Sequence, residues 1–206
     1  MRAWMVAALM TVSSVAAAGK PGAIVIPPAE VEIGAASPVG PSEVGTATEF
    51  RAGMHWASLY WHPTRFDIGV GFVASYRESF AMTAERSIAP EDNTLSLKGA
   101  YVSAAYAIES HRHWRTWLGG RLEMLAGDHD GRSVTTTGVA VRLATELYST
   151  GVGGVSDPHV AALFAGAFAV GVYVEGIHRG IPGDLGEIDA AAGLTMRIPF
   201  IAAVGD

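Results

Sequence analysis

Apolar and polar residues alternate with a period of two through most of this chain. Between residues 65 and 77, every even position is apolar from Phe66 to Tyr76, whereas the odd positions are charged, small or Val73. Successive side chains of a β-strand point to opposite faces, so this pattern is typical of a strand whose two faces meet different environments. The segment therefore predicts a β-strand.

The same alternation recurs along the chain. The further segments are 48–60, 95–108, 114–126, 137–147, 164–179 and 187–200. The segment 95–108 is less regular, with Lys98 its only interior charge. One such segment is a weak signal, but seven in one chain predict an antiparallel sheet of many strands. Residues 29–36 (AEVEIGAA) also alternate and add an eighth strand.

The polar faces of these segments combine charges of both signs. Seven arginines and seven acidic residues lie on them: Arg51, Arg77, Arg115, Arg121, Arg142, Arg179 and Arg197 against Glu49, Asp67, Glu123, Glu146, Glu175, Glu187 and Asp189. The strand at 29–36 places Glu30 and Glu32 opposite Val31 and Ile33. Because an unpaired buried charge is costly, equal numbers of both signs suit an enclosed interior in which they neutralise one another.

The two faces can be arranged in two ways. A soluble barrel buries the apolar face, whereas a transmembrane barrel turns it to lipid and keeps polar residues inside. The mixture of charges with Gly and Ala suits a narrow interior, and outward aromatic residues near strand ends suit membrane interfaces. These aromatic residues are Trp56, Tyr60, Phe66, Trp114 and Phe200. Arg outnumbers Lys twelve to two, which also favours a barrel interior, although genome base composition produces the same bias.

The N-terminus has the layout of a secretory signal peptide. Arg2 precedes an apolar stretch that ends in Ala16, Ala17 and Ala18, a small-residue cleavage site. Residues 1–18 are therefore expected to be removed, which leaves 13 basic and 20 acidic residues, a net charge of −7. Residues 19–27 then read as a periplasmic tether, 28–201 as the barrel and 202–206 as a C-terminal tail.

Connection lengths predict how the strands cross the membrane. The candidate connections are 61–65, 78–94, 109–113, 127–134, 149–158 and 180–186. External loops of outer-membrane barrels are longer than periplasmic turns. With both chain ends in the periplasm, 37–44, 78–94, 127–134 and 180–186 are external, and the longest loop, 78–94, falls outside. The segment 149–158 is long for a periplasmic turn.

On this pattern the chain resembles the small eight-stranded outer-membrane β-barrel proteins of Gram-negative bacteria, over residues 28–201. Its final strand, 193–200 (GLTMRIPF), is similar to the family's C-terminal insertion signal, although residues 201–206 follow it. The resemblance implies an all-β, antiparallel up-and-down transmembrane barrel in contact with outer-membrane lipid. It also implies a monomer that is assembled by the barrel-insertion machinery.

Composition excludes several other classes of protein. The net charge of −6 and the charged fraction of 17% argue against a nucleic-acid partner. The absence of Cys removes disulfides, thiolate metal sites and Cys nucleophiles. The longest uncharged stretch after the leader, Pro158 to Val174, is too short for a comfortable helical span. A single domain accounts for the length of 206 residues.

No catalytic, cofactor-binding or metal-binding residue is predicted. His111 and His113 fall in a short turn, Asp128 and Asp130 flank His129 at a loop tip, and His55 and Ser58 face opposite sides of a strand. Eight strands leave an interior that side chains fill. We therefore expect a non-enzymatic outer-membrane barrel with a plugged ionic interior and a structural role, or a role in surface interaction through 78–94 and 127–134. The alternatives are a soluble periplasmic barrel with an apolar cavity for a lipid-like ligand, and a lipid-modifying outer-membrane enzyme.

Overall fold

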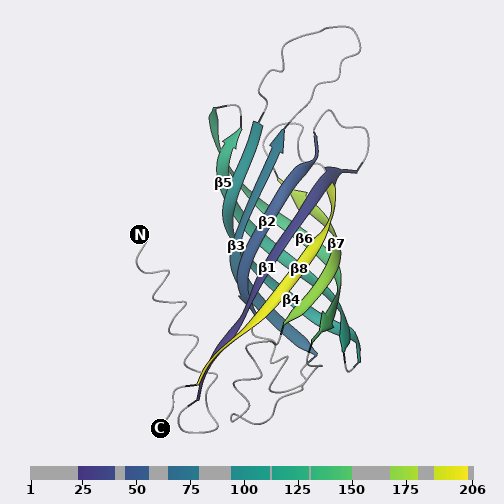
Figure 1. Cartoon of the computed structure of the whole chain (residues 1–206). Coiled ribbons are helices and arrows are strands. Elements are labelled where there is room, and N and C mark those ends of the chain that lie inside the picture. The colour runs from purple at the N-terminus through teal and green to yellow at the C-terminus, as the bar shows by residue number, and fades with distance from the viewer. Residues whose placement is uncertain are drawn as a thin grey trace.

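The computed structural model describes residues 23–39, 45–55, 65–78, 94–111, 113–129, 131–149, 168–180 and 188–203. They form eight strands that pair in sequence order, and the eighth pairs with the first to close a barrel (Figure 1). The strands are β1 (Ala23–Pro38), β2 (Ala47–His55), β3 (Phe66–Glu78), β4 (Thr94–Ser110), β5 (Trp114–His129), β6 (Arg132–Tyr148), β7 (Ala169–Arg179) and β8 (Ile188–Ala203).

Every neighbouring pair of strands is antiparallel, including β1 with β8. The predicted eight-stranded up-and-down barrel is therefore confirmed. Closure gives each strand two hydrogen-bonded neighbours within the barrel, so the wall has no exposed edge. None of the described residues belongs to an apolar helix of the length needed to cross a membrane.

The period-two pattern of the sequence appears as an alternation of burial. In β3, Asp67, Val73 and Arg77 are buried inside the barrel, whereas Phe66 and Phe72 are about half exposed on the outside. The same alternation holds in the other strands, so the charged face points inward and the apolar face outward. Lys98 of β4 is exposed on the outer face.

The described ends of the chain, Ala23 and Ala203, pair with each other at the lower end of the barrel in Figure 1. The connections between β2 and β3, β4 and β5, and β6 and β7 lie at this lower end, because adjacent strands run in opposite directions. The other four connections lie at the upper end. This grouping matches the one predicted from the connection lengths.

Two segments differ from the prediction. Residues 127–134, expected as a loop, belong mostly to β5 and β6, which run on to a turn between His129 and Arg132. Gly131 adopts φ +75° there, a conformation that a glycine accepts without strain, and its N–H donates to the Asp128 carboxylate at 2.8 Å. The strand predicted at 164–179 also differs, because β7 begins at Ala169. Residues 79–93 and 150–167 lie outside the described residues, so the expectation that 78–94 is the longest connection stays a prediction.

Strands β1 and β8 are longer than expected at their lower ends. β1 starts at Ala23, within the segment predicted as a tether, and β8 continues to Ala203, within the predicted tail. The two segments pair with each other there, and this pairing supplies the hydrogen bonds that keep both in strand geometry. Residues 1–22, which include the predicted signal peptide, lie outside the described residues.

The small apolar part of the interior lies towards the upper end. Val73, Leu95, Leu97, Tyr101 and Leu125 form one buried cluster from β3, β4 and β5. A second cluster combines four alanines with one larger side chain: Ala36, Ala47, Ala140, Ala191 and Ile177. Below these clusters the interior is occupied mainly by charged side chains.

Candidate functional site: the ionic interior

All seven predicted interior arginines point into the barrel, and six of them are buried while Arg142 is partly buried. Of the predicted acidic partners, all but Glu187 are also buried inside, and Glu187 lies outside the described residues. The strand period alone places these side chains, because each of them shares its parity with the inward face of its strand. The structure shows in addition which charges meet.

Six of these charges form a closed ring in which arginine and glutamate alternate, which we call the upper ring. Its members are Arg51, Glu175, Arg121, Glu123, Arg179 and Glu49, in the order in which they contact each other. They come in pairs from three strands that are not neighbours: β2, β5 and β7. The ring therefore crosses the interior of the barrel and ties opposite walls together.

The contacts within the upper ring are short. Arg121 reaches Glu175 at 2.9 Å and Glu123 at 2.8 Å, and Arg179 reaches Glu123 at 2.9 Å and Glu49 at 2.6 Å. Arg51 closes the ring by contacting both Glu49 and Glu175. Planar guanidinium groups suit such sites, since each presents several N–H donors in fixed directions. Charge-assisted bonds of this kind are the stronger class of hydrogen bond.

A second closed set of contacts lies nearer the lower end, and we call it the lower ring. Arg197 contacts Glu30 at 3.0 Å and Asp67 at 2.9 Å. His55 contacts the same two carboxylates, Glu30 through Nε2 at 2.7 Å and Asp67 through Nδ1 at 2.8 Å. Both imidazole nitrogens thus lie close to carboxylate oxygens, and Nδ1 forms a hydrogen bond with Asp67, whereas the contact of Nε2 with Glu30 lacks hydrogen-bond geometry. A positive charge on His55 would attract both carboxylates.

Glu32 connects the two rings. It accepts from Arg51 of the upper ring at 2.9 Å and contacts Arg142, which also approaches Glu30 of the lower ring at 3.5 Å. Glu146 extends the lower ring on the other side through Arg197 at 3.0 Å. The two rings, Glu32, Arg142 and Glu146 consequently form one continuous network.

The charges of this interior balance when His55 is counted as a cation. Within the described strands, the buried carboxylates are Glu30, Glu32, Glu49, Asp67, Glu123, Glu146, Glu175 and Asp189, eight in all. The inward cations are the seven predicted arginines and His55, so eight positive charges face eight negative ones. Arg77 and Asp189 form their own pair at 2.8 Å near the upper end. Neutrality matters because the Coulomb interaction of charges is strong in a medium of low dielectric constant.

Aromatic side chains share the interior with the arginines. The Arg142 guanidinium lies 4.6 Å from the centre of the Tyr173 ring, and the guanidinium groups of Arg115 and Arg197 each lie 5.5 Å from the centre of Trp117. Stacking of this kind adds a cation–π attraction to the ion pairs. The Trp117 indole N–H also donates to Glu146 at 2.9 Å.

Tyr173 and Tyr101 each require glycines on the neighbouring wall. A Cβ atom on Gly34 or Gly193 would overlap the Tyr173 hydroxyl oxygen, and one on Gly53 would overlap that of Tyr101. These glycines therefore make room for two large side chains in a barrel too narrow to hold them otherwise.

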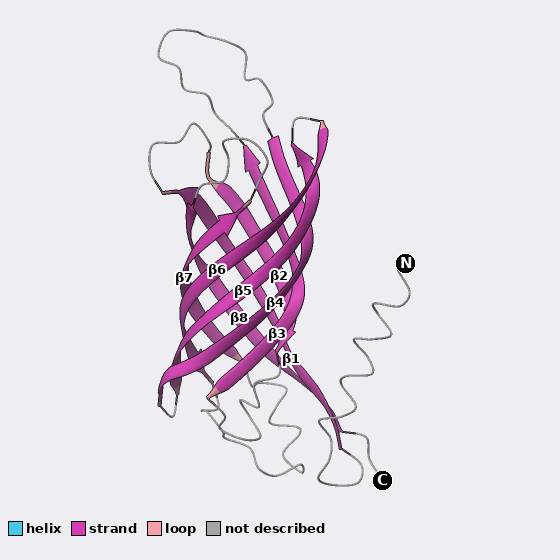
Figure 2. Ribbon diagram, turned by 180° about the vertical axis from the view of Figure 1, so that it is seen from behind, coloured by secondary structure: helices cyan, strands magenta, loops and turns pink. Residues whose placement is uncertain are grey.

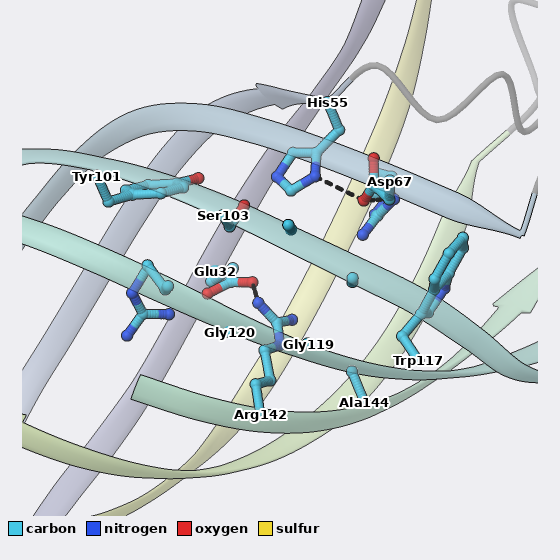
Figure 3. Close-up of a pocket in the computed structure, with 14 residues that line it drawn as sticks. Glu32, His55, Asp67, Tyr101, Ser103, Trp117, Gly119, Gly120, Arg142 and Ala144 are labelled. Carbon is cyan, nitrogen blue, oxygen red and sulfur yellow. Dashed lines mark hydrogen bonds and ion pairs between the residues drawn. The ribbon is translucent and has the colours of Figure 1, made fainter. Parts of the chain in front are cut away.

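One cavity lies among the charged residues and has a volume of about 30 Å³. Figure 3 shows His55 and Asp67 on one side of it and the contact between Glu32 and Arg142 on the other. Small residues also line the cavity, among them Ser103, Gly119 and Ala144. The cavity has room for two or three water molecules, each of which needs roughly 10–15 Å³ of this kind of space. It is an order of magnitude smaller than a typical small-molecule site.

The histidine and aspartate residues considered for metal binding do not come together in the described part of the chain. His111 contacts Glu109 at 3.1 Å and stacks on Trp114 at the lower end, whereas Asp128 lies at the upper end and accepts from the Gly131 N–H. The described residues contain no group of three or more metal-ligating side chains. Ser58, His62, Asp130 and His159 lie outside the described residues.

The sequence alone did not identify three members of the network as interior ion partners. Glu30 and Glu32 belong to the first strand, whose polar face was recognised but not included in the set of interior charges. His55 shares the parity of Glu49 and Arg51, which is the signal that could have added it.

Comparison with known proteins finds a similarity in structure but not in sequence family. No protein-family model and no curated protein matches this chain. Among solved structures, the chain is similar to the crystal structure of Neisserial surface protein A, with 15% sequence identity and a TM-score of 0.47. The match covers 84% of this chain and 95% of that one.

Proposed function

We propose that the protein is an integral outer-membrane barrel whose interior is closed by the ionic network, with a structural or surface-interaction role. The supporting observation is its inverted polarity. Arg51, Glu123 and Glu146 are almost fully buried, whereas the apolar side chains of Leu122, Met124 and Val141 are 58%, 73% and 62% exposed. A soluble monomer rarely exposes a continuous apolar surface of this kind, whereas a lipid-facing wall requires one.

A closed barrel is also one of the two structures that satisfy all backbone hydrogen bonds inside a bilayer. Outward aromatic residues lie towards the strand ends, as interfacial anchors do. Phe66 and Tyr106 are cross-strand partners near the lower end, and Tyr76 lies near the upper end, all of them about half exposed. We propose that the lower end, where β1 and β8 meet, faces the periplasm.

The alternative of a soluble barrel with an apolar ligand cavity has less support. It requires the apolar face of the strands to line the interior, but most of that face points outward, and the buried Val73 and Leu residues form only a small cluster near the upper end. The interior offers charged groups instead. A lipid-like ligand would have to displace paired charges in order to enter.

We further propose that the protein is not an enzyme. The buried pair His55 and Asp67 resembles part of a catalytic triad, but Glu30 contacts the other imidazole nitrogen of His55. The Nε2 atom that a general base would use lies 2.7 Å from a Glu30 carboxylate oxygen, where a nucleophile would have to stand.

Three measurements on one preparation test the proposal. The first is membrane fractionation, the second is the electrophoretic mobility of boiled against unboiled protein, and the third is conductance in a planar bilayer. We expect outer-membrane partitioning, a heat-dependent mobility shift and no steady conductance. Soluble periplasmic protein with identical mobility in both lanes would refute the membrane placement. A heat shift accompanied by steady conductance would refute only the closed interior.

A further inference from the structure

Strands β1 and β8 continue past the lower end of the barrel as a two-stranded ribbon. Within the barrel, β1 pairs with β2 only from Ala29 upward, and β8 pairs with β7 only as far as Arg197. Below these residues, Ala23–Ile26 and Phe200–Ala203 pair only with each other. Both views show this ribbon running down and away to one side of the barrel (Figures 1 and 2).

Prolines mark the point at which the ribbon leaves the wall. Pro27 and Pro28 lie on β1 and Pro199 on β8, and the β1–β8 register is irregular between Ile26 and Ala29. Proline has no N–H to donate and fixes its own φ, so it interrupts a hydrogen-bonded ladder. The ribbon is thereby separated from the barrel wall while remaining continuous with it.

The ribbon combines two properties that rarely occur together. All eight of its residues are apolar: Ala23, Ile24, Val25, Ile26, Phe200, Ile201, Ala202 and Ala203. At the same time each of its strands has one edge without a partner strand among the described residues. A two-stranded apolar ribbon has little stability in water. The hydrocarbon core of a bilayer does not suit the ribbon either, because its unpaired backbone N–H and C=O groups would find no hydrogen-bond partners there.

The headgroup region of a bilayer satisfies both requirements. It offers an apolar boundary to the side chains, and water and lipid headgroups as hydrogen-bond partners for the strand edges. The outer wall directly above the ribbon is apolar as well, since Val31, Met196 and Ile198 are 39%, 41% and 39% exposed. The ribbon therefore continues a surface that already faces lipid in the proposed function.

We propose that this ribbon lies in the headgroup region of the periplasmic leaflet and anchors the barrel to it as an interfacial extension. The inference rests on the proposed membrane placement of the barrel. It adds a lipid-binding surface outside the transmembrane wall, formed by residues on both sides of the β1–β8 seam.

The chain has no Cys, so single cysteines can carry a spin label without background. Val25→Cys and Ile201→Cys are cross-strand partners and give two independent reports from the ribbon. The labelled protein is refolded into vesicles of phosphatidylethanolamine and phosphatidylglycerol, and folding is verified by the heat-dependent mobility shift. Collisions with oxygen, which concentrates in lipid, are compared with collisions with a water-soluble nickel chelate. Leu122→Cys on the outer wall and Ser133→Cys at the upper end serve as the lipid and water references.

We expect the ratio of oxygen to nickel collisions at both ribbon sites to be several-fold above that at Ser133 and below that at Leu122. A ratio equal to that at Ser133 would place the ribbon in water and overturn the inference. Protection from both reagents would overturn it in favour of cover by protein at the free strand edges. If the collision ratio at Leu122 equals that at Ser133, the proposed membrane placement of the barrel fails. Failure of the ribbon inference alone leaves the ratio at Leu122 high, so the two failures are distinguishable.

Discussion

Removal of one carboxylate from the upper ring provides the most direct test of the ionic interior. Glu175 accepts from both Arg51 and Arg121, and none of its side chain is exposed. The substitution Glu175→Gln keeps the shape of the side chain but removes its charge. The neutral ring of three arginines and three glutamates then carries one uncompensated positive charge in a buried position.

The expected cost follows from that uncompensated charge. Loss of one partner of a buried ion pair typically lowers the free energy of unfolding by about 3–5 kcal/mol. Arg121→Gln alone leaves one uncompensated negative charge in the upper ring, because Glu123 and Glu175 both lose a cationic partner. The double variant Glu175→Gln with Arg121→Gln restores neutrality. Its cost should therefore be smaller than the sum of the two single costs, by about 0.5–3 kcal/mol.

The matched control makes the same chemical change in an exposed pair. Glu109 contacts His111 at 3.1 Å, and the side chains are 56% and 51% exposed. Exposed pairs contribute little, so Glu109→Gln should change the free energy of unfolding by less than about 1 kcal/mol. The assay is urea unfolding and refolding in phospholipid vesicles, followed by tryptophan fluorescence and by the unboiled mobility shift.

The reasoning is refuted if Glu175→Gln and Glu109→Gln lower the free energy of unfolding by the same amount. If Glu175→Gln costs no more than Glu109→Gln, water must reach the upper ring and screen the remaining charge. An additive double variant would likewise show that Arg121 and Glu175 do not interact. Either result would contradict a charge-balanced interior in which the upper ring is shielded from bulk water.

Three further predictions use the same unfolding assay. Val141→Arg places a charge on the exposed apolar wall near mid-strand and should lower the free energy of unfolding by about 2–4 kcal/mol if that wall faces lipid as proposed, whereas a neutral result would place it in water. His55→Gln leaves Glu30 and Asp67 with one shared cation, Arg197, and should destabilise the barrel by about 3–5 kcal/mol, and His55→Lys should recover part of this loss because it restores the charge. Gly34→Ala should lower the free energy of unfolding by about 1–3 kcal/mol because its Cβ overlaps the Tyr173 hydroxyl. Tyr173→Phe in the same chain should recover part of that loss. If it recovers nothing, the loss comes instead from the overlap of the Cβ with the Ala192 backbone oxygen.

The alternation of side chains made much of this architecture predictable. Strand period places each residue on one of two faces, so the inward arginines and the outward valines and leucines follow from parity. Closure into eight strands follows from counting alternating segments. The end of each strand is harder to predict, because beyond the apolar band both faces of a strand can be polar. Residues 127–134 are polar for this reason and nevertheless form the tip of the β5–β6 hairpin.

The pairing of the interior charges was not predictable in the same way. Arg51 and Glu175 are 124 positions apart, and they meet because barrel closure sets the relative height of β2 and β7. Parity indicates that both side chains point inward but not at which height. The lower ring has the same origin, since Glu30, His55, Asp67 and Arg197 come from four strands. A prediction of these contacts requires the stagger of the strands as well as their count.

The upper ring has a consequence for the chain before it folds. Its three pairs of residues belong to strands that meet across the interior only when β8 has reached β1, so an open sheet cannot form the ring. In an unclosed chain these six charges remain hydrated, and each strand presents one water-compatible face beside its apolar one. Charge of this kind keeps chains soluble. The residues that neutralise each other in the finished barrel therefore serve as solubilising groups while the polypeptide is still unfolded in water.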